Sequence, residues 1–259
     1  GIDHLVDLPG VGKNLQDHID YITVHKYNSI KLIGFSLKTI LFKYPYEVIK
    51  YLITKTGLFT STIAEAGAFL KTRDDLEAPN IQFHYAPALI VDHGRSLLWG
   101  TGMSCHSCLL RPKSRGEVTL ESADPFADPL IDPKFLSHPD DMKDMIAGYK
   151  MMMGVLSTEP FSKYISDHTM RPIDINDDSD IEQAMREEAD TVYHPVGTCK
   201  MGDDEMSVVD SRLKVHNMKG LRVVDASIMP TLVGGNTNAP TIMIGEKASD
   251  MILQDWNIH

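Results

Sequence analysis

The stretch GLRVVDASIMPTLVGGNTNAPTIMIGEKASDMI, residues 220–252, carries the clearest succession of element signals in the chain. The apolar run from Leu221 to Val224 predicts a buried strand that ends at Asp225. A glycine-rich loop follows, and residues 238–252 predict a helix whose N-cap is Asn238. Its apolar face would comprise Ile244, Ala248, Met251 and Ile252. A strand, an acidic residue, a glycine-rich loop and a helix in this order are typical of a ligand site in an α/β fold.

Upstream of this stretch the sequence predicts an antiparallel sheet with helices. Residues 80–86 alternate apolar and polar side chains, and residues 103–110 and 116–122 also have the character of strands. The alternation favours a sheet with one covered face. Helices are predicted over 139–156, where methionines recur at helical spacing and are expected in the core, and over 177–191.

Residues 31–53, KLIGFSLKTILFKYPYEVIKYLI, are strongly apolar but are interrupted by lysines and a proline. No stretch of the chain approaches the roughly 18 uninterrupted apolar residues that a membrane-spanning helix needs. Packing in the core, as an amphipathic helix or a lid, is the default expectation. Lysines interspersed with bulky apolar side chains also suit a helix that lies on a membrane surface, and this alternative stays open.

The formal net charge of −11 over 259 residues opposes nucleic acid as a partner. Binding to a phosphate backbone requires a clustered excess of Lys and Arg. Cys105, Cys108 and Cys199 are an odd number of cysteines, so no disulfide framework is predicted. The chain begins without a signal-peptide pattern, so the compartment stays open.

The segment DTVYHPVGTCKMG, residues 190–202, places His194 between Tyr193 and Pro195. A zinc site is disfavoured, because a structural zinc draws two compact ligand pairs and the chain has a single C-x-x-C. A cysteine hydrolase is disfavoured too, because Cys199 lies on the same short segment as His194. Proton transfer and a structural role for His194 remain, and the irregular backbone at Pro195 and Gly197 favours a side chain held toward a pocket.

Five segments, in this order, resemble one enzyme family: LPGVGKNLQDH, RPKSRGEVTL, YHPVGTCKMG, LRVVDASIMP and GGNTNAPTIMIGEKASDMI. The chain is similar to the glucose-methanol-choline (GMC) oxidoreductases, which are FAD enzymes that oxidise alcohols. The resemblance runs from about residue 1 to residue 255. It is closer to the choline dehydrogenase and animal glucose dehydrogenase-like members, because Asn238 stands where glucose oxidase has histidine.

The resemblance implies that His194 is the catalytic histidine and that Asn238 is its partner beside the flavin. Histidine suits the removal of a hydroxyl proton near neutral pH, whereas an asparagine amide can only position the alcohol oxygen. The N-terminal end of the last helix would face the flavin, where its positive end would stabilise negative charge on the reduced ring. The expected FAD-binding residues are Asp225, Ala226, Asn238, Ala239, Pro240 and Thr241, together with Asn14, Asp17 and His18 of the segment that covers the cofactor.

The implied fold is α+β, with an antiparallel-sheet substrate domain and the closing strand and helix of an incomplete FAD-binding α/β domain. The expected domains are a FAD-covering segment at 1–25, a substrate-binding domain at 26–217 and the last strand and helix of the flavin domain at 218–259. The G-x-G-x-x-G turn that begins such enzymes is not found here, so the resemblance implies a C-terminal part whose N-terminal FAD-binding half is missing.

The expected function is therefore oxidation of a CH–OH group of an alcohol or sugar, by proton abstraction and hydride transfer to FAD. The alternative is a non-catalytic GMC-like binding module that cannot hold FAD alone. The substrate, the electron acceptor (oxygen, a quinone or a dye) and the oligomeric state stay open. Localisation also stays open, and secretion is included because a signal peptide would lie in the missing part.

Overall fold

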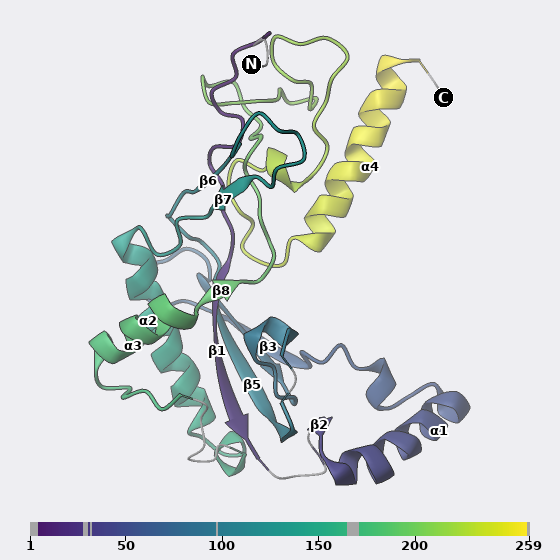
Figure 1. The fold of residues 1–259 in the computed structure, drawn as a ribbon, viewed down its shortest axis with the longest axis vertical. Helices are drawn as coiled ribbons and strands as arrows, with labels where there is room; N and C mark the ends of the chain where they lie inside the picture. Colours follow the sequence, from purple (N-terminus) through teal and green to yellow (C-terminus); the bar gives the residue numbers. More distant parts are fainter. Residues whose placement is uncertain (1–4, 28–30, 32, 97, 165–170, 258–259) are drawn as a thin grey trace. The chain divides into compact units, whose positions relative to one another are not determined.

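The computed structural model describes residues 5–27, 31, 33–96, 98–164 and 171–257. The chain divides into two compact units (Figure 1). Unit 1 comprises residues 1–19, 110–142 and 191–259, and unit 2 comprises residues 20–109 and 143–190. These are units of packing. The expected division at 25/26 and 217/218 concerns which residues face FAD and which face substrate, and it stays a prediction.

Unit 2 is built on a six-stranded sheet with the strand order β3-β4-β5-β1-β8, in which β2 also pairs with β5. The strand bounds are β1 Ile19–Lys26, β2 Gly34–Phe35, β3 Ala66–Leu70, β4 Ile81–Ala86, β5 Gly100–Leu109 and β8 Asp190–Thr191. The β3–β4 and β4–β5 pairs are antiparallel, so that Phe83 lies opposite both Ala68 and Ser107. The expected antiparallel sheet and its strands near 80–86 and 103–110 are confirmed.

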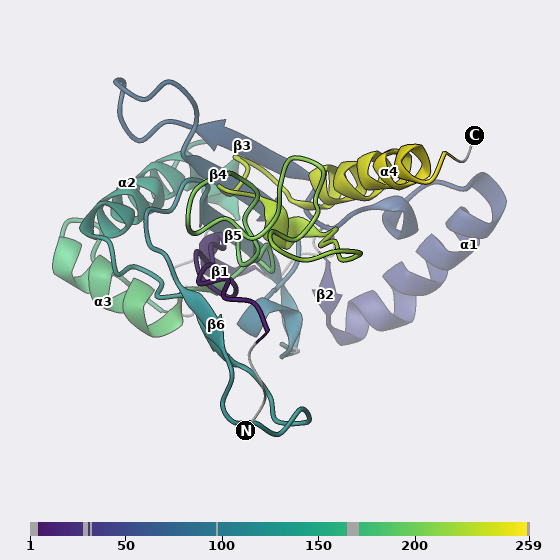
Figure 2. The same cartoon turned by 90° about the horizontal axis from the view of Figure 1, so that it is seen from above.

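Two helices, α2 (Pro139–Leu156) and α3 (Asp178–Glu188), lie side by side in Figures 1 and 2. The α2 helix packs on β4 and β5 at Gly148, where an added Cβ would lie 3.0 Å from Ile81 Cδ1 and 2.9 Å from Ser107 Oγ. Met145, Met152 and Leu156 are fully buried. Both predicted helices are confirmed, although α3 ends at Glu188 and not at 191. Of the predicted apolar stripe on α2, Met142, Met145, Tyr149 and Leu156 are buried, whereas Ile146 and Met153 are partly exposed.

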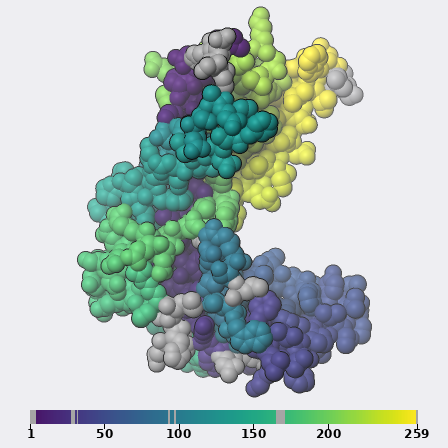
Figure 3. Space-filling model, in the orientation of Figure 1, coloured from purple at the N-terminus to yellow at the C-terminus, as the bar shows by residue number. Residues whose placement is uncertain are grey.

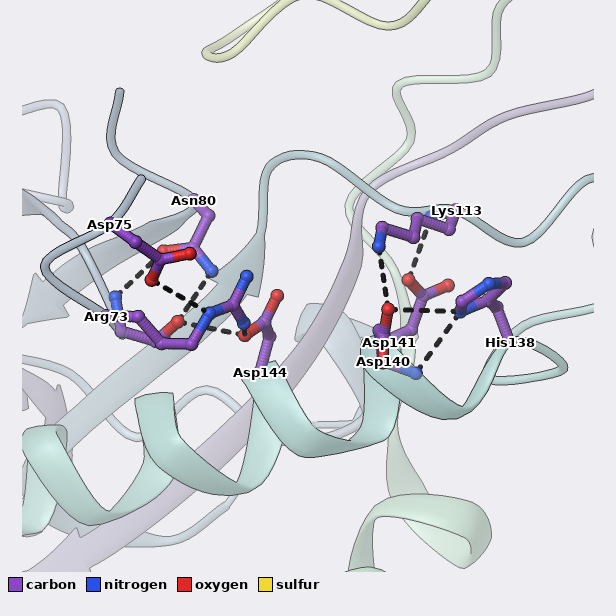
Figure 4. Close-up of polar contacts among 9 residues, drawn as sticks. Arg73, Asp75, Asn80, Lys113, His138, Asp140, Asp141 and Asp144 are labelled. Atoms are coloured by element: carbon purple, nitrogen blue, oxygen red, sulfur yellow. Dashed lines mark hydrogen bonds and ion pairs between the residues drawn. The ribbon is translucent and has the colours of Figure 1, made fainter. Parts of the chain in front are cut away.

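Two polar clusters tie loops to α2 (Figure 4). In unit 2, Arg73 Nη1 and Thr72 Oγ1 donate to Asp144 Oδ1 at 2.6 and 2.9 Å, which fixes the turn after β3. In unit 1, buried Asp141 accepts from the amides of Lys113 and Ser114 at 2.8 and 2.9 Å. A carboxylate that accepts several hydrogen bonds in this way satisfies backbone donors that burial would otherwise leave unpaired.

The default expectation for residues 31–53, a helix in the core, is wrong. A π-helical turn at Thr39–Lys43 leads into α1 (Tyr44–Thr54), which has no buried residue. Glu47 accepts the amide of Leu58 at 2.8 Å, so the polar side of α1 faces its own chain. Its apolar side chains, which include Ile49, Leu52 and Ile53, are exposed instead. Within the part of the chain that the structure describes, no helix has the length and hydropathy to cross a bilayer.

Unit 1 contains the β6–β7 hairpin (Glu117–Thr119 and Leu130–Asp132), long irregular loops and α4 (Asn238–Asp255). In Figure 3, α4 is the yellow segment, and it packs beside the yellow-green loops of the same unit. The core of the unit consists of buried apolar side chains from these loops and from α4: Val196, Val208, Val209, Leu213, Val215, Ile228, Met229, Leu232, Ile244 and Ala248.

The predicted strand at 221–225 is not formed. Residue Arg222 makes one isolated bridge with Lys214, and a short 3-10 helix follows at Ala226–Ile228. Leu221 and Val224 are exposed. An apolar run becomes a strand only where a neighbouring strand pairs with it, and within the described residues none continues this ladder. The predicted helix is confirmed as α4, although its N-cap is Thr237 and not Asn238.

Candidate active site around His194

His194 lies on an irregular loop of unit 1 that begins just after β8. Tyr193 has a φ of 65° and Gly197 a φ of 96°, so the loop contains two left-handed positions in five residues. The His194 amide donates to Asp17 Oδ1 at 2.9 Å, and the Thr191 hydroxyl donates to Asp17 Oδ2. The local backbone is thus fixed by a carboxylate from a segment far away in the sequence.

The segment of residues 14–18, NLQDH, holds two loops together. Gln16 and Val196 exchange backbone hydrogen bonds at 3.0 and 2.9 Å. The Gln16 side chain donates to Pro230 O at 3.1 Å and accepts the Leu232 amide at 3.1 Å. Asn14 donates to Pro230 O at 3.2 Å. The His194 loop and the loop before α4 are therefore both docked on this one segment.

His18 is fully buried within this arrangement. Its Nδ1 lies 2.9 Å from His194 Nδ1, and its Nε2 lies 3.2 Å from Leu110 O and 3.1 Å from Val233 O. The two imidazole rings meet edge to face, with centroids 5.1 Å apart and an interplanar angle of 86°. Among the described residues, no hydrogen bond to His194 Nε2 is found.

Burial dominates the electrostatics of the three titratable groups. It lowers the pKa of His194 below its ordinary 6.5, and the Asp17 carboxylate partly opposes this. Burial, reinforced by the nearby His194, lowers the pKa of His18 to about 4. Burial also raises the pKa of Asp17, against hydrogen bonds from the Thr191 hydroxyl and the His194 amide. Both histidines are accordingly neutral near pH 7.

The predicted cofactor residues Asp225, Ala226 and Thr241 line one cavity of about 670 Å³ in unit 1, together with Asp17 and Tyr193. Asp225 Oδ1 accepts the amide of Ser227 at 2.7 Å, so its carboxylate caps the short 3-10 helix. The structure therefore brings these five residues to one cavity wall. The side chain of Asp225 thus serves a backbone amide of its own loop.

The remaining predicted residues lie at the N-terminus of α4. Asn238 and Ala239 are exposed, and the N-cap Thr237 makes no side-chain capping bond. The first amides of an α-helix have no intrahelical acceptor, so this end is electropositive and open to a ligand. Within the described part of the chain, no hydrogen bond joins the Asn238 side chain to His194 or to any other residue.

The structure gives no support for a reactive cysteine thiolate or a zinc site. Burial raises the pKa of Cys105 to about 12, and burial also raises the pKa of Cys199. Cys199 is partly buried against the apolar core of unit 1. In the ranges that the structure describes, no group of three or more His, Cys, Asp or Glu side chains is placed to hold a metal ion.

Sequence reasoning missed the contacts that build this site. It placed Asn14, Asp17 and His18 near the cofactor, but it did not predict that they would hold the His194 loop, and it did not single out Gln16. The signal available was the four polar side chains among the five residues of NLQDH. Buried polar side chains need partners, and such a run predicts a network without identifying its other half.

Comparison with known proteins gives a consistent result. Residues 112–245 match the family profile described as GMC oxidoreductase. The chain is 45% identical over 257 residues to an alcohol dehydrogenase [acceptor] of Pseudomonas putida, covering 98% of this chain and 46% of that protein. It is 38% identical over 246 residues to an oxygen-dependent choline dehydrogenase of Cronobacter sakazakii, covering 95% and 44%. The chain thus spans about half the length of the curated relatives it matches.

Solved structures show the same fold. A formate oxidase of Aspergillus oryzae, in a study of its FAD modification, matches with a TM-score of 0.87 at 26% identity, over 98% of this chain and 49% of that one. A pyridoxine 4-oxidase from Mesorbium loti matches with a TM-score of 0.77 at 23% identity, over 98% and 45%. Since the profile covers more than half of its length, the chain belongs to the GMC oxidoreductase family, and it corresponds to the C-terminal part of these proteins.

Proposed function

We propose that this chain forms the catalytic-histidine part of an FAD-dependent oxidoreductase that oxidises the CH–OH group of an alcohol. The observation that carries the proposal is His194 itself. Its ring is neutral, its Nδ1 is engaged by His18, and its Nε2 has no partner among the described residues. A neutral imidazole with one free nitrogen is suited to act as a general base.

The residues of unit 1 fit a flavin cofactor in two respects. The open N-terminus of α4 offers backbone amides and a positive end, which suit a ring that becomes negative on reduction. The cavity beside it, lined by Asp225, Ala226 and Thr241, has room for part of a large ligand. In the proposal these residues, with 238–240, hold FAD, and the segment of Asn14, Asp17 and His18 lies beside it. When bound, FAD takes up the hydride equivalent that leaves the substrate carbon.

The chain's own residues then have distinct tasks. His194 accepts the hydroxyl proton at Nε2 as the C–H bond is oxidised. Asn238 donates from its amide to the alcohol oxygen and so orients the carbon. Its side chain is exposed and has no hydrogen bond to any described residue, so it is available for this role. Asp17 holds the His194 backbone in place through its carboxylate.

An alcohol substrate is supported by the names of the relatives, an alcohol dehydrogenase and a choline dehydrogenase. We propose an alcohol rather than a sugar on this ground. The names of the same relatives leave two options for the electron acceptor, oxygen or another acceptor. A paired assay with oxygen and with a quinone or dye distinguishes them.

We further propose that the FAD site is completed by sequence outside this chain. Relatives are about twice as long, and apolar side chains of unit 1 at Leu221, Val224, Ile242 and Met243 are exposed. In the proposal, these side chains pack against that additional sequence. Activity is therefore measured on the full-length protein that contains this chain.

The test is a kinetic comparison of His194→Ala with a matched histidine variant. His216 Nε2 contacts Gly202 O at 2.9 Å, and His216→Gln keeps a donor there. Loss of a general base lowers kcat/KM by about 10²- to 10⁴-fold, so we expect this loss for His194→Ala and an unchanged rate for His216→Gln. A FAD-loaded protein that oxidises no alcohol in a broad panel would instead favour the non-catalytic module.

A further inference from the structure

His18 is a buried histidine whose Nε2 faces two carbonyl oxygens, Leu110 O at 3.2 Å and Val233 O at 3.1 Å. A carbonyl oxygen can only accept a hydrogen bond. Nε2 of His18 must therefore carry a proton, because a lone pair there would face two other lone pairs in a buried site.

The proton on Nε2 decides the state of the other nitrogen. The ring is fully buried and its pKa is lowered to about 4, so His18 is neutral near pH 7. A neutral imidazole that carries its proton on Nε2 has a lone pair on Nδ1. The 2.9 Å contact between the two Nδ1 atoms requires one proton between them, and that proton belongs to His194.

We infer that His18 is a positioning residue that fixes the tautomer of His194, with the proton on Nδ1 and the lone pair on Nε2. The inference rests on the proposed function, in which Nε2 of His194 is the base. It assigns to His18 a task in proton transfer, although its side chain is fully buried. The hydroxyl proton passes to Nε2 of His194, and His18 neither gains nor loses a proton.

The reverse arrangement fails on the same contacts. If His18 donated from Nδ1, it would need either a charge in a fully buried position or a lone pair on Nε2 against Leu110 O and Val233 O. His194 would then carry its proton on Nε2, where it would donate to the alcohol and could not accept from it. The observed contacts favour the catalytically competent tautomer over the inactive one.

Two substitutions separate tautomer control from simple anchoring. In His18→Asn, the amide oxygen can lie near the position of Nδ1 and still accept from His194. In His18→Gln, the longer side chain can place its amide donor near the two carbonyls, but no acceptor remains beside His194. We expect kcat to fall by about 10²-fold or more in His18→Gln, with little change in KM. We expect His18→Asn to retain most of kcat.

A second readout does not depend on activity. In ¹⁵N-histidine NMR spectra of the purified protein, assigned with His194→Ala, we expect His194 to show a protonated Nδ1 and an unprotonated Nε2. The same pattern is expected in His18→Asn, and a mixture of tautomers in His18→Gln. If one of the two variants fails to fold, the wild-type spectrum still tests the assignment.

The outcomes distinguish the inference from the function on which it rests. If His194→Ala remains active, the proposed function fails, whatever the spectra show. If His194→Ala is inactive but His18→Gln has normal kcat and an unchanged tautomer, only the role of His18 is overturned. A wild-type spectrum with the proton on Nε2 of His194 would overturn it as well.

Discussion

His25 and His18 are both fully buried histidines, but they differ in their partners. Among the described residues, neither ring nitrogen of His25 has a hydrogen-bond partner, whereas both nitrogens of His18 have one. Burial lowers the pKa of His25 to about 4. We therefore expect His25 in β1 to make unit 2 less stable as the pH falls.

His25→Leu tests this directly. Below the ordinary pKa of 6.5 the unfolded chain binds a proton that folded His25 resists, so stability falls as the pH drops from 6.5 toward 4. At pH 5, 1.5 units below 6.5, this amounts to about 2 kcal/mol. The variant should lose about that much less free energy of unfolding between pH 7.5 and pH 5, as measured by urea denaturation. If the wild-type protein and His25→Leu lose the same free energy of unfolding between pH 7.5 and pH 5, His25 is not the source of the acid sensitivity.

Asp17 should set part of the pH dependence of activity. Burial lowers the pKa of His194, and the carboxylate of Asp17 raises it in opposition. His194 must be unprotonated to act as a base, so kcat/KM falls as the pH drops through its pKa. Asp17→Asn removes the charge but keeps an acceptor for the His194 amide, so we expect the acid limb of the profile to move to lower pH. A limb that stays in place or moves upward would contradict this account.

At the scale of residues, the sequence supports the choice of His194 better than it supports the site around it. The irregular segment around Pro195 and the family resemblance both point to this histidine. The contact between His18 and His194 joins positions 176 residues apart, and no local pattern encodes it. The capping role of Asp225 is different, because an acidic residue two positions before the amide it accepts is a local signal.

Among the elements, α2 offers a matched pair of glycines. Gly148 packs on β4 and β5, with atoms of Ser107 and Ile81 about 3 Å from an added Cβ. At Gly154, no atom of the described residues lies within 4 Å of an added Cβ. Alanine stabilises a helix interior relative to glycine by about 1 kcal/mol. Gly154→Ala should therefore raise the midpoint of urea unfolding, and Gly148→Ala should lower it because the sheet must shift. Equal shifts in both variants would show that α2 does not pack on the sheet at Gly148.

Elements with their own start signals were predictable. Three helices whose positions are confirmed carry such signals: the proline and aspartates in the first turn of α2, the aspartate that caps α3 and the proline near the start of α4. The failures have a different cause. The apolar run at 221–225 has no pairing strand among the described residues, so it does not form a strand. The α1 helix turns its polar side toward its own chain and so leaves its apolar side exposed. Hydrophobic periodicity predicts neither the missing partner strand nor the direction that a helix faces.

The chain spans about half the length of the relatives it matches. Part of any cofactor site can therefore come from sequence beyond this chain. The exposed apolar side chains at Ile242 and Met243 lie on α4, the helix whose N-terminus is proposed to face the flavin. We therefore predict that residues 1–259 alone, purified after mixing with FAD, retain little flavin absorbance, and stoichiometric flavin in that sample would contradict the prediction.

The central claim is that His194 removes the proton as an alcohol reduces bound FAD. The most direct measurement mixes FAD-loaded protein with an alcohol in the absence of oxygen and follows the visible absorbance of oxidised flavin. We predict rapid loss of that absorbance in the wild-type protein and a rate lower by about 10²-fold or more in His194→Ala with equal flavin content. Equal rates of flavin reduction in the two proteins would contradict the account.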